Sequence, residues 1–119
     1  MQDQINQVYD AHLRLRKSIG KKSTKLTDKK KLQIEIILKE YHCEFIILLM
    51  DYLRLGEDFY ARFIRGENKR KKDYTSLSNI FRPTKLDDKI EKAIAWKAEL
   101  DFDNQEIYHP FCVAGGEND

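Results

Sequence analysis

Two histidine–cysteine pairs contain the residue types best suited to hold a metal ion. His42 and Cys43 are adjacent, and His109 and Cys112 are separated by two residues, so together they have the composition of a structural zinc site. Adjacent residues on a helix point about 100° apart, which makes it difficult for His42 and Cys43 to bind one ion. We therefore predict no metal ligands and no cofactor, with Cys43 as a small buried apolar residue and His42 on the flank of its helix.

The sequence contains none of the common catalytic motifs. There is no glycine-rich phosphate loop, no nucleophile elbow, and no metalloprotease or kinase signature. The carboxylates lie at predicted helix starts, on exposed helix faces or near the C-terminus. No pair of them stands in an apolar stretch that would raise the pKa of a general acid. We therefore predict a binding protein and not an enzyme.

Basic residues form two runs, a pattern that favours contact with the phosphate backbone of nucleic acids. Residues 14–31 contain nine lysines and arginines and one acid, and the second run spans residues 69–72. Basic side chains in connections reach phosphates easily, and each contact releases counterions. Tyr74 and Arg82 offer planar groups on which bases can stack. The predicted nucleic-acid-binding residues are Lys21, Lys22, Lys25, Lys29, Lys30, Lys31, Lys69, Arg70, Lys71, Lys72 and Arg82.

Charge is distributed unevenly along the chain, although the net charge is only +2. Residues 98–119 contain six acids and no lysine or arginine. This separation favours a basic face for an anionic partner, and an acidic tail that screens that face or binds a second protein. The alternative interpretation of such runs is an ordinary solvated surface.

A function of a different class is a protein–protein adapter, or an inhibitor that grips a larger host or viral complex. Its apolar anchors would be Phe59, Tyr60, Phe63 and Trp96, where these are exposed. The distribution of charge and aromatic residues distinguishes the two functions. A continuous basic face favours nucleic acid, and an exposed aromatic patch rimmed by acids favours the adapter.

The elements that must position these residues are helical. Apolar residues recur at steps of three and four, and glycine (5) and proline (2) are scarce, so we predict an all-α fold, a compact bundle of four to five helices. Thr27, Ser76 and Thr84 are the predicted N-caps of helices that begin after them. The predicted helices span residues 3–19, 28–55, 57–65, 76–81 and 85–100.

The predicted helix at residues 28–55 is the longest and forms the centre of the bundle. Between Phe45 and Met50 it is apolar on every face, so this segment must be covered by other helices or by a second subunit. We therefore expect the protein to form a homo-oligomer.

One domain accounts for the chain of 119 residues, with a helical part at 1–100 and an acidic, partly docked tail at 101–119. The N-terminal residues lack the basic and apolar regions of a secretory signal. The longest apolar run, residues 45–50, is too short to span a bilayer. We expect a cytoplasmic protein without membrane contact and without a structural disulfide.

The segment from Asn79 to Ile90, NIFRPTKLDDKI, resembles a segment near the C-terminus of phage and prophage replisome organisers, which are DnaD-like replication-initiation proteins. The matching or conservatively replaced positions are Ile80, Phe81, Arg82, Pro83, Lys85, Leu86 and Ile90. They cover about a tenth of the chain, and Asn79 stands where the family has threonine. The resemblance implies a phage or mobile-element origin and a role in replication, in which the family helps to load a helicase.

Overall fold

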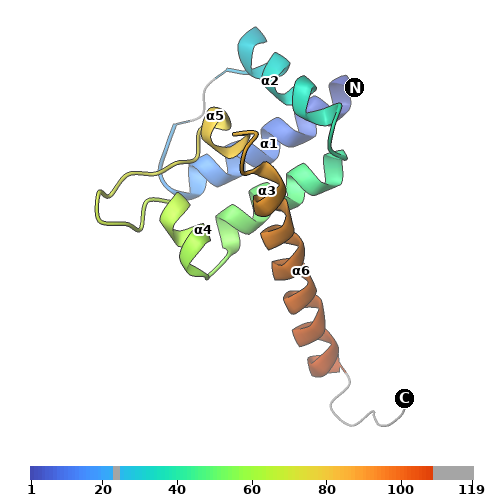
Figure 1. Cartoon of the computed structure of the whole chain (residues 1–119), viewed down its shortest axis with the longest axis vertical. Helices are drawn as coiled ribbons and strands as arrows, with labels where there is room; N and C mark the ends of the chain where they lie inside the picture. Colours follow the sequence, from blue (N-terminus) through green and yellow to red (C-terminus); the bar gives the residue numbers. More distant parts are fainter. Residues whose placement is uncertain (23–24, 109–119) are drawn as a thin grey trace.

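The computed structural model describes residues 1–22 and 25–108, which form six helices and no strand (Figure 1). The prediction of an all-α fold is therefore confirmed. In chain order the helices are α1 (Gln2–Ser18), α2 (Asp28–Leu38), α3 (Cys43–Leu55), α4 (Phe59–Ile64), α5 (Leu77–Ile80) and α6 (Leu86–Tyr108).

Helix α3 lies at the centre and packs against α1, α4 and α6. Its residues Ile46, Leu49 and Leu53 are fully buried at steps of three and four. They meet the equivalent face of α1, where Val8 and Leu15 are also fully buried. Burial of these side chains is the main source of stability in a helical core of this size.

The single helix predicted at residues 28–55 is wrong, because the chain turns at residues 39–42 and forms α2 and α3 instead. No glycine or proline marks this turn. At 100° per residue, the buried face of α2 (Ile34 and Ile37) and the mean buried face of α3 would point roughly 140° apart on one straight helix. The break lets both faces cover the same core.

Side-chain caps stabilise the starts of the helices on either side of this turn. Thr27 Oγ1 accepts from the Lys30 N–H (3.2 Å), which confirms the predicted cap of α2. His42 lies at the N-cap of α3, where its Nδ1 accepts from the Glu44 N–H (3.3 Å). A histidine is an uncommon N-cap, so the sequence carried only a weak signal for a helix start here.

Helix α4 follows α3 after a sharp connection at Gly56. A Cβ added to Gly56 would lie 2.7 Å from the Tyr52 carbonyl oxygen, so close packing excludes any larger residue. Asp58 caps α4 by accepting from the Ala61 N–H (3.0 Å), and the Tyr52 hydroxyl donates to its other oxygen (2.6 Å). Ser76 caps α5 as predicted, accepting from the Asn79 N–H (3.2 Å).

Helix α6 packs its first turns against α3 and then projects away from the other helices (Figure 1). It begins at Leu86, two positions after Thr84, the predicted cap. Leu86, Ile90 and Ala93 are buried on its inner face. The helix continues to Tyr108, beyond the predicted end at residue 100, and the rest of the predicted acidic tail, residues 109–119, lies outside the described residues.

The apolar run in α3 is covered largely by the chain's own helices. Ile46, Leu49 and Met50 are fully buried, whereas Phe45 is 43% exposed. Self-association therefore remains a prediction, and this run gives it less support than the sequence suggested. No helix within residues 1–22 and 25–108 is long and apolar enough to cross a membrane.

Substitutions on the buried and the exposed face of α3 should lower stability by different amounts. Leu49→Ala should lower the free energy of unfolding by about 2–5 kcal/mol, because it removes buried methyl groups and leaves a cavity. Phe45→Ala, on the exposed side of the same helix, should lower it by less than about 1 kcal/mol. Urea unfolding of both variants measures this, and equal losses would contradict the described packing of α3.

Candidate nucleic-acid interface

The second basic run lies in the loop between α4 and α5, which has a defined backbone conformation. Gly66 has a positive φ of 107° and Lys71 one of 55°. The Asn68 side chain crosses the loop, donating to the carbonyl oxygens of Phe63 (2.9 Å) and Lys72 (2.7 Å) and accepting from the Lys72 N–H (3.2 Å). These bonds hold the basic residues on the outer side of a closed turn.

A polar cluster ties the end of this loop to α1, with His12 and Thr75 buried and Arg16 and Asp73 half-buried. His12 Nε2 donates to the Thr75 carbonyl oxygen (2.7 Å), and Arg16 donates to Thr75 Oγ1 (3.0 Å). The Thr75 hydroxyl donates in turn to Asp73 Oδ1 (2.6 Å). No sequence motif predicted this cluster, although His12 is spaced at helical steps with the buried Val8 and Leu15, where a buried histidine needs a partner.

The same cluster changes the pKa values of two of its members. Burial is the largest influence on Asp73 and by itself would raise the pKa, but hydrogen bonds from Thr75 and Lys21 outweigh it and hold the pKa below its usual value. Burial also lowers the pKa of His12, and the hydrogen bond to Thr75 only partly offsets this. His12 is therefore neutral and Asp73 is ionised near neutral pH.

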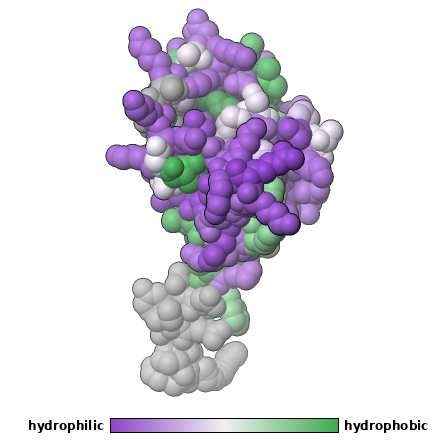
Figure 2. Space-filling model, turned by 90° about the vertical axis from the view of Figure 1, so that its left-hand side faces the viewer, coloured by the Kyte–Doolittle hydropathy of each residue, from purple (hydrophilic) through white to green (hydrophobic). Residues whose placement is uncertain are grey.

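Asp73 brings the two basic runs together. Its Oδ2 lies 3.2 Å from Lys21 Nζ, and its Oδ1 lies 3.5 Å from Arg16. Lys21, at the end of α1, is thus held beside the loop that carries residues 69–72. The molecule seen from the side of this loop is largely hydrophilic, with scattered apolar side chains between the polar ones (Figure 2).

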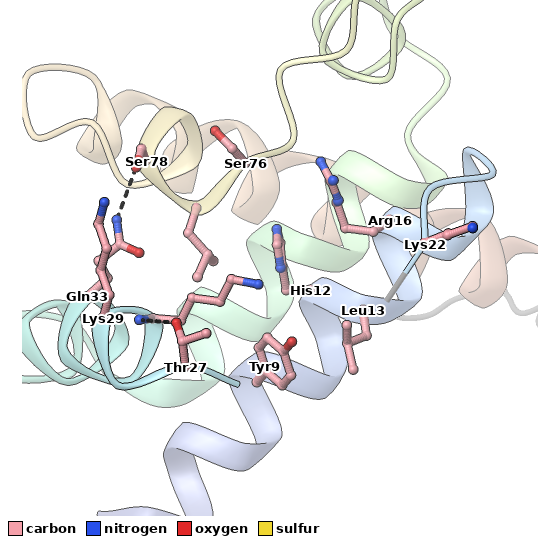
Figure 3. Close-up of a pocket in the computed structure, with 12 residues that line it drawn as sticks. Tyr9, His12, Leu13, Arg16, Lys22, Thr27, Lys29, Gln33, Ser76 and Ser78 are labelled. Carbon is pink, nitrogen blue, oxygen red and sulfur yellow. Dashed lines mark hydrogen bonds between the residues drawn. The ribbon is translucent and has the colours of Figure 1, made fainter. Parts of the chain in front are cut away.

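Three other lysines of the first run lie around a separate hollow, whereas Lys25 and Lys31 do not line it. This hollow of about 250 Å³ is lined by α1, the start of α2 and the start of α5, and Lys22 and Lys29 are among its lining residues (Figure 3). Lys30 also lines it and lies over the Tyr9 ring, 5.7 Å from its centre. Of the eleven predicted basic residues, Lys30 and Lys31 are half-buried and the others are exposed.

Arg82 belongs to a groove that the sequence did not predict. The groove has a volume of about 480 Å³ and runs between the basic loop and the segment that joins α5 to α6. Four basic residues and three aromatic residues line it, with no acid among the lining residues. The full lining is Tyr60, Phe63, Ile64, Lys72, Tyr74, Asn79, Arg82, Lys85 and Lys89.

Lys89 is the buried member of this groove, with 8% of the residue exposed. Its Nζ donates to the carbonyl oxygens of Asn79 (2.6 Å) and Ile80 (3.1 Å), where a positive charge stabilises the C-terminal end of α5. Burial lowers its pKa, and Arg82 and Lys85 lower it further. The signal for Lys89 was present in the sequence, since it falls on the same helical face as Leu86, Ile90 and Ala93.

The four aromatic residues predicted as partner anchors do not form one patch. Phe59 is 79% exposed and its ring centre lies 6.0 Å from that of Phe63. Tyr60 is half-buried beneath Lys92, whose Nζ lies 5.5 Å from the ring centre. Trp96 lies 5.9 Å from the ring of Tyr52 and faces a different hollow.

Only the first of the two histidine–cysteine pairs, His42 and Cys43, lies within the described residues. His42 caps α3, and Cys43 is a buried free thiol whose Sγ lies 3.6 Å from Gln7 Oε1. His109 and Cys112 lie outside the described residues. Within the described part of the chain, no group of three or more His, Cys, Asp or Glu side chains is arranged to hold a metal ion.

No protein-family model, curated protein or solved structure matches this chain.

The buried histidine predicts a pH dependence of stability. The folded pKa of His12 lies below its ordinary value of 6.5, so the unfolded chain takes up the proton first. The stability that neutral His12 contributes is fully present above pH 6.5. It should fall as the pH drops below 6.5, until the folded pKa is reached. Thermal unfolding at pH 7.5 and 5.0 should show this loss, and His12→Gln should reduce it.

Leu49→Ala provides the control, because it lowers stability without removing a titratable group. It should leave the difference between pH 7.5 and 5.0 at the wild-type value. An unchanged difference in the His12→Gln variant would mean that His12 is not the buried neutral group.

Proposed function

We propose that this protein is a non-enzymatic nucleic-acid-binding accessory protein that contacts the phosphate backbone through the groove between the basic loop and the α5–α6 segment. The observation that carries the proposal is the lining of this groove, which includes Lys72, Arg82 and Lys85 and no acid. The basic loop and the segment that joins α5 to α6 thus contribute to one site of positive charge. Under the alternative interpretation, an ordinary solvated surface, basic residues from two segments would have no reason to line one groove.

The chemistry of the groove suits a polyanion. Lys72 and Lys85 are exposed and extend from a loop and from the start of α6, so their amines can follow a backbone without loss of buried structure. Each phosphate that they neutralise releases a condensed counterion. The tie between Asp73 and α1 holds the loop in place before binding, which lowers the entropic cost of ordering it.

The resemblance to replisome organisers adds a biological context to this proposal. The resembling segment, Asn79 to Ile90, supplies four residues of the groove: Asn79, Arg82, Lys85 and Lys89. The part of the chain that resembles replication proteins is therefore the part that would contact nucleic acid. We propose DNA handling during the replication of a phage or mobile element as the role.

The hollow beside Trp96 favours the adapter as a second candidate. It has a volume of about 350 Å³, and Glu57, Asp58 and Glu99 are among the residues that line it, together with Leu100. An aromatic side chain rimmed by acids suits a protein partner with basic and apolar groups. This site and the basic groove are distinct, so one chain can use both.

Removing two lysines of the groove should weaken binding and reduce its dependence on salt. For Lys72→Ala/Lys85→Ala we expect roughly tenfold weaker binding or more, and a slope of log K against log salt smaller by about 1.4–1.8, because two phosphate contacts are lost. Fluorescence anisotropy with a labelled DNA of about 30 nucleotides, measured between about 50 and 200 mM NaCl, gives both the affinity and the slope.

The control is Lys39→Ala/Lys97→Ala, which removes the same charge from two exposed lysines that do not line the groove. It should leave the slope at the wild-type value. Equal effects of the two double variants would indicate attraction by net charge alone. A wild-type protein without measurable affinity for DNA or RNA at about 50 mM salt would end the nucleic-acid proposal in favour of the adapter.

A further inference from the structure

An aromatic slot lies beside the basic groove, between α4 and the basic loop. Its volume is about 540 Å³ and it is lined by Phe59, Phe63, Asn68, Lys69, Arg70 and Tyr74. The rings of Phe63 and Tyr74 stack almost parallel, with centres 5.5 Å apart and an angle of 5° between them. Phe59 continues this row, 6.0 Å from Phe63.

Phe59 is the open end of the row of rings. Tyr74 already has Phe63 stacked on it and Lys72 Nζ 5.8 Å from its ring centre. Phe59 is 79% exposed, the largest exposed fraction among the large apolar residues identified as exposed in the described part of the chain. An exposed ring bordered by Lys69 and Arg70 offers an apolar face to a planar partner and an electrostatic attraction to an anionic one.

We propose that the slot binds an unpaired base of a single-stranded nucleic acid, stacked on the Phe59 ring. This inference rests on the proposed function and adds to it the class of nucleic acid that is bound. A base has two flat apolar faces, which stack on aromatic side chains whatever the sequence. The phosphates on either side of that base carry the negative charge that Lys69 and Arg70 would meet.

The slot and the groove share a wall. Phe63 and Tyr74 line both of them. One strand can therefore place a phosphate against Lys72 in the groove and the adjoining base against Phe59 in the slot. The loop that carries the lysines is also the loop that positions Tyr74, through the hydrogen bond from its N–H to the Ile64 carbonyl oxygen (2.8 Å).

A duplex fits this arrangement poorly. The base faces of a duplex are stacked on one another, and only the base edges are accessible in the grooves. To reach Phe59, a base would have to leave the stack, at a cost of a few kcal/mol. The slot therefore favours a single strand, while the lysines of the groove attract either form.

Phe59→Ala tests the stacking contact without changing the charge of the protein. With fluorescein-labelled single-stranded oligothymidine of about 20 nucleotides, the variant should bind roughly 5- to 150-fold more weakly than the wild type, the range for losing one stacked base. Its affinity for a mixed-sequence duplex of the same length should be unchanged. The salt dependence with the single strand should also be unchanged, because no phosphate contact is lost.

Phe45→Ala is the matched control, since Phe45 is an exposed phenylalanine on α3 that does not line the slot. It should leave both affinities at the wild-type values. A strand containing 2-aminopurine gives a direct measure of stacking. Its fluorescence should be quenched by the wild type and by Phe45→Ala, and much less by Phe59→Ala at saturating protein.

The outcomes separate this inference from the proposed function. Wild-type protein that binds both DNAs, with Phe59→Ala weakening neither or both equally, would overturn the stacking site and leave the basic groove standing. Release of the bound single strand by a poly-glutamate peptide as effectively as by unlabelled oligothymidine would also overturn it. Wild-type protein that binds neither DNA would overturn the proposed function and this inference together.

Discussion

The arrangement of the candidate interface depends on the contact of Asp73 and Thr75 with α1. Thr75 is fully buried and joins its carbonyl oxygen to His12 and its hydroxyl to Asp73 and Arg16. The hydrogen bonds of this cluster give the loop one preferred position, although His12 Nδ1 has no hydrogen-bond partner among the described residues. The basic run and Tyr74 take their places from that position, whereas Phe59 and Phe63 are placed by α4.

This contact also redistributes the positive charge. Asp73 is ionised and pairs with Lys21 and Arg16, so these two residues serve the fold and offer less charge to a ligand. Surface pairs add little stability, but here the Asp73 side chain is half-buried and its carboxylate accepts hydrogen bonds as well. The positive charge that remains available to a ligand therefore lies mainly in the groove lined by Lys72, Arg82 and Lys85.

Aromatic and basic residues have complementary roles in this arrangement. Lysines on a surface attract any polyanion and do not distinguish among them. An open ring at the end of an ordered row adds a contact that requires an accessible base. The combination of Phe59 with the neighbouring basic loop distinguishes this surface from the hollow at Trp96, where three acids and one lysine are among the lining residues.

The sequence by itself determined the helical class and the caps at Thr27 and Ser76, because these depend on local spacing and local hydrogen bonds. It could not reveal the break before Cys43, because the break lets two apolar faces reach one core and needs no turn residue. Nor could it show that Lys72 and Arg82 line one groove, or that Phe63 and Tyr74 stack. The loop between α4 and α5 has no periodic pattern, and only its folded path brings these residues together.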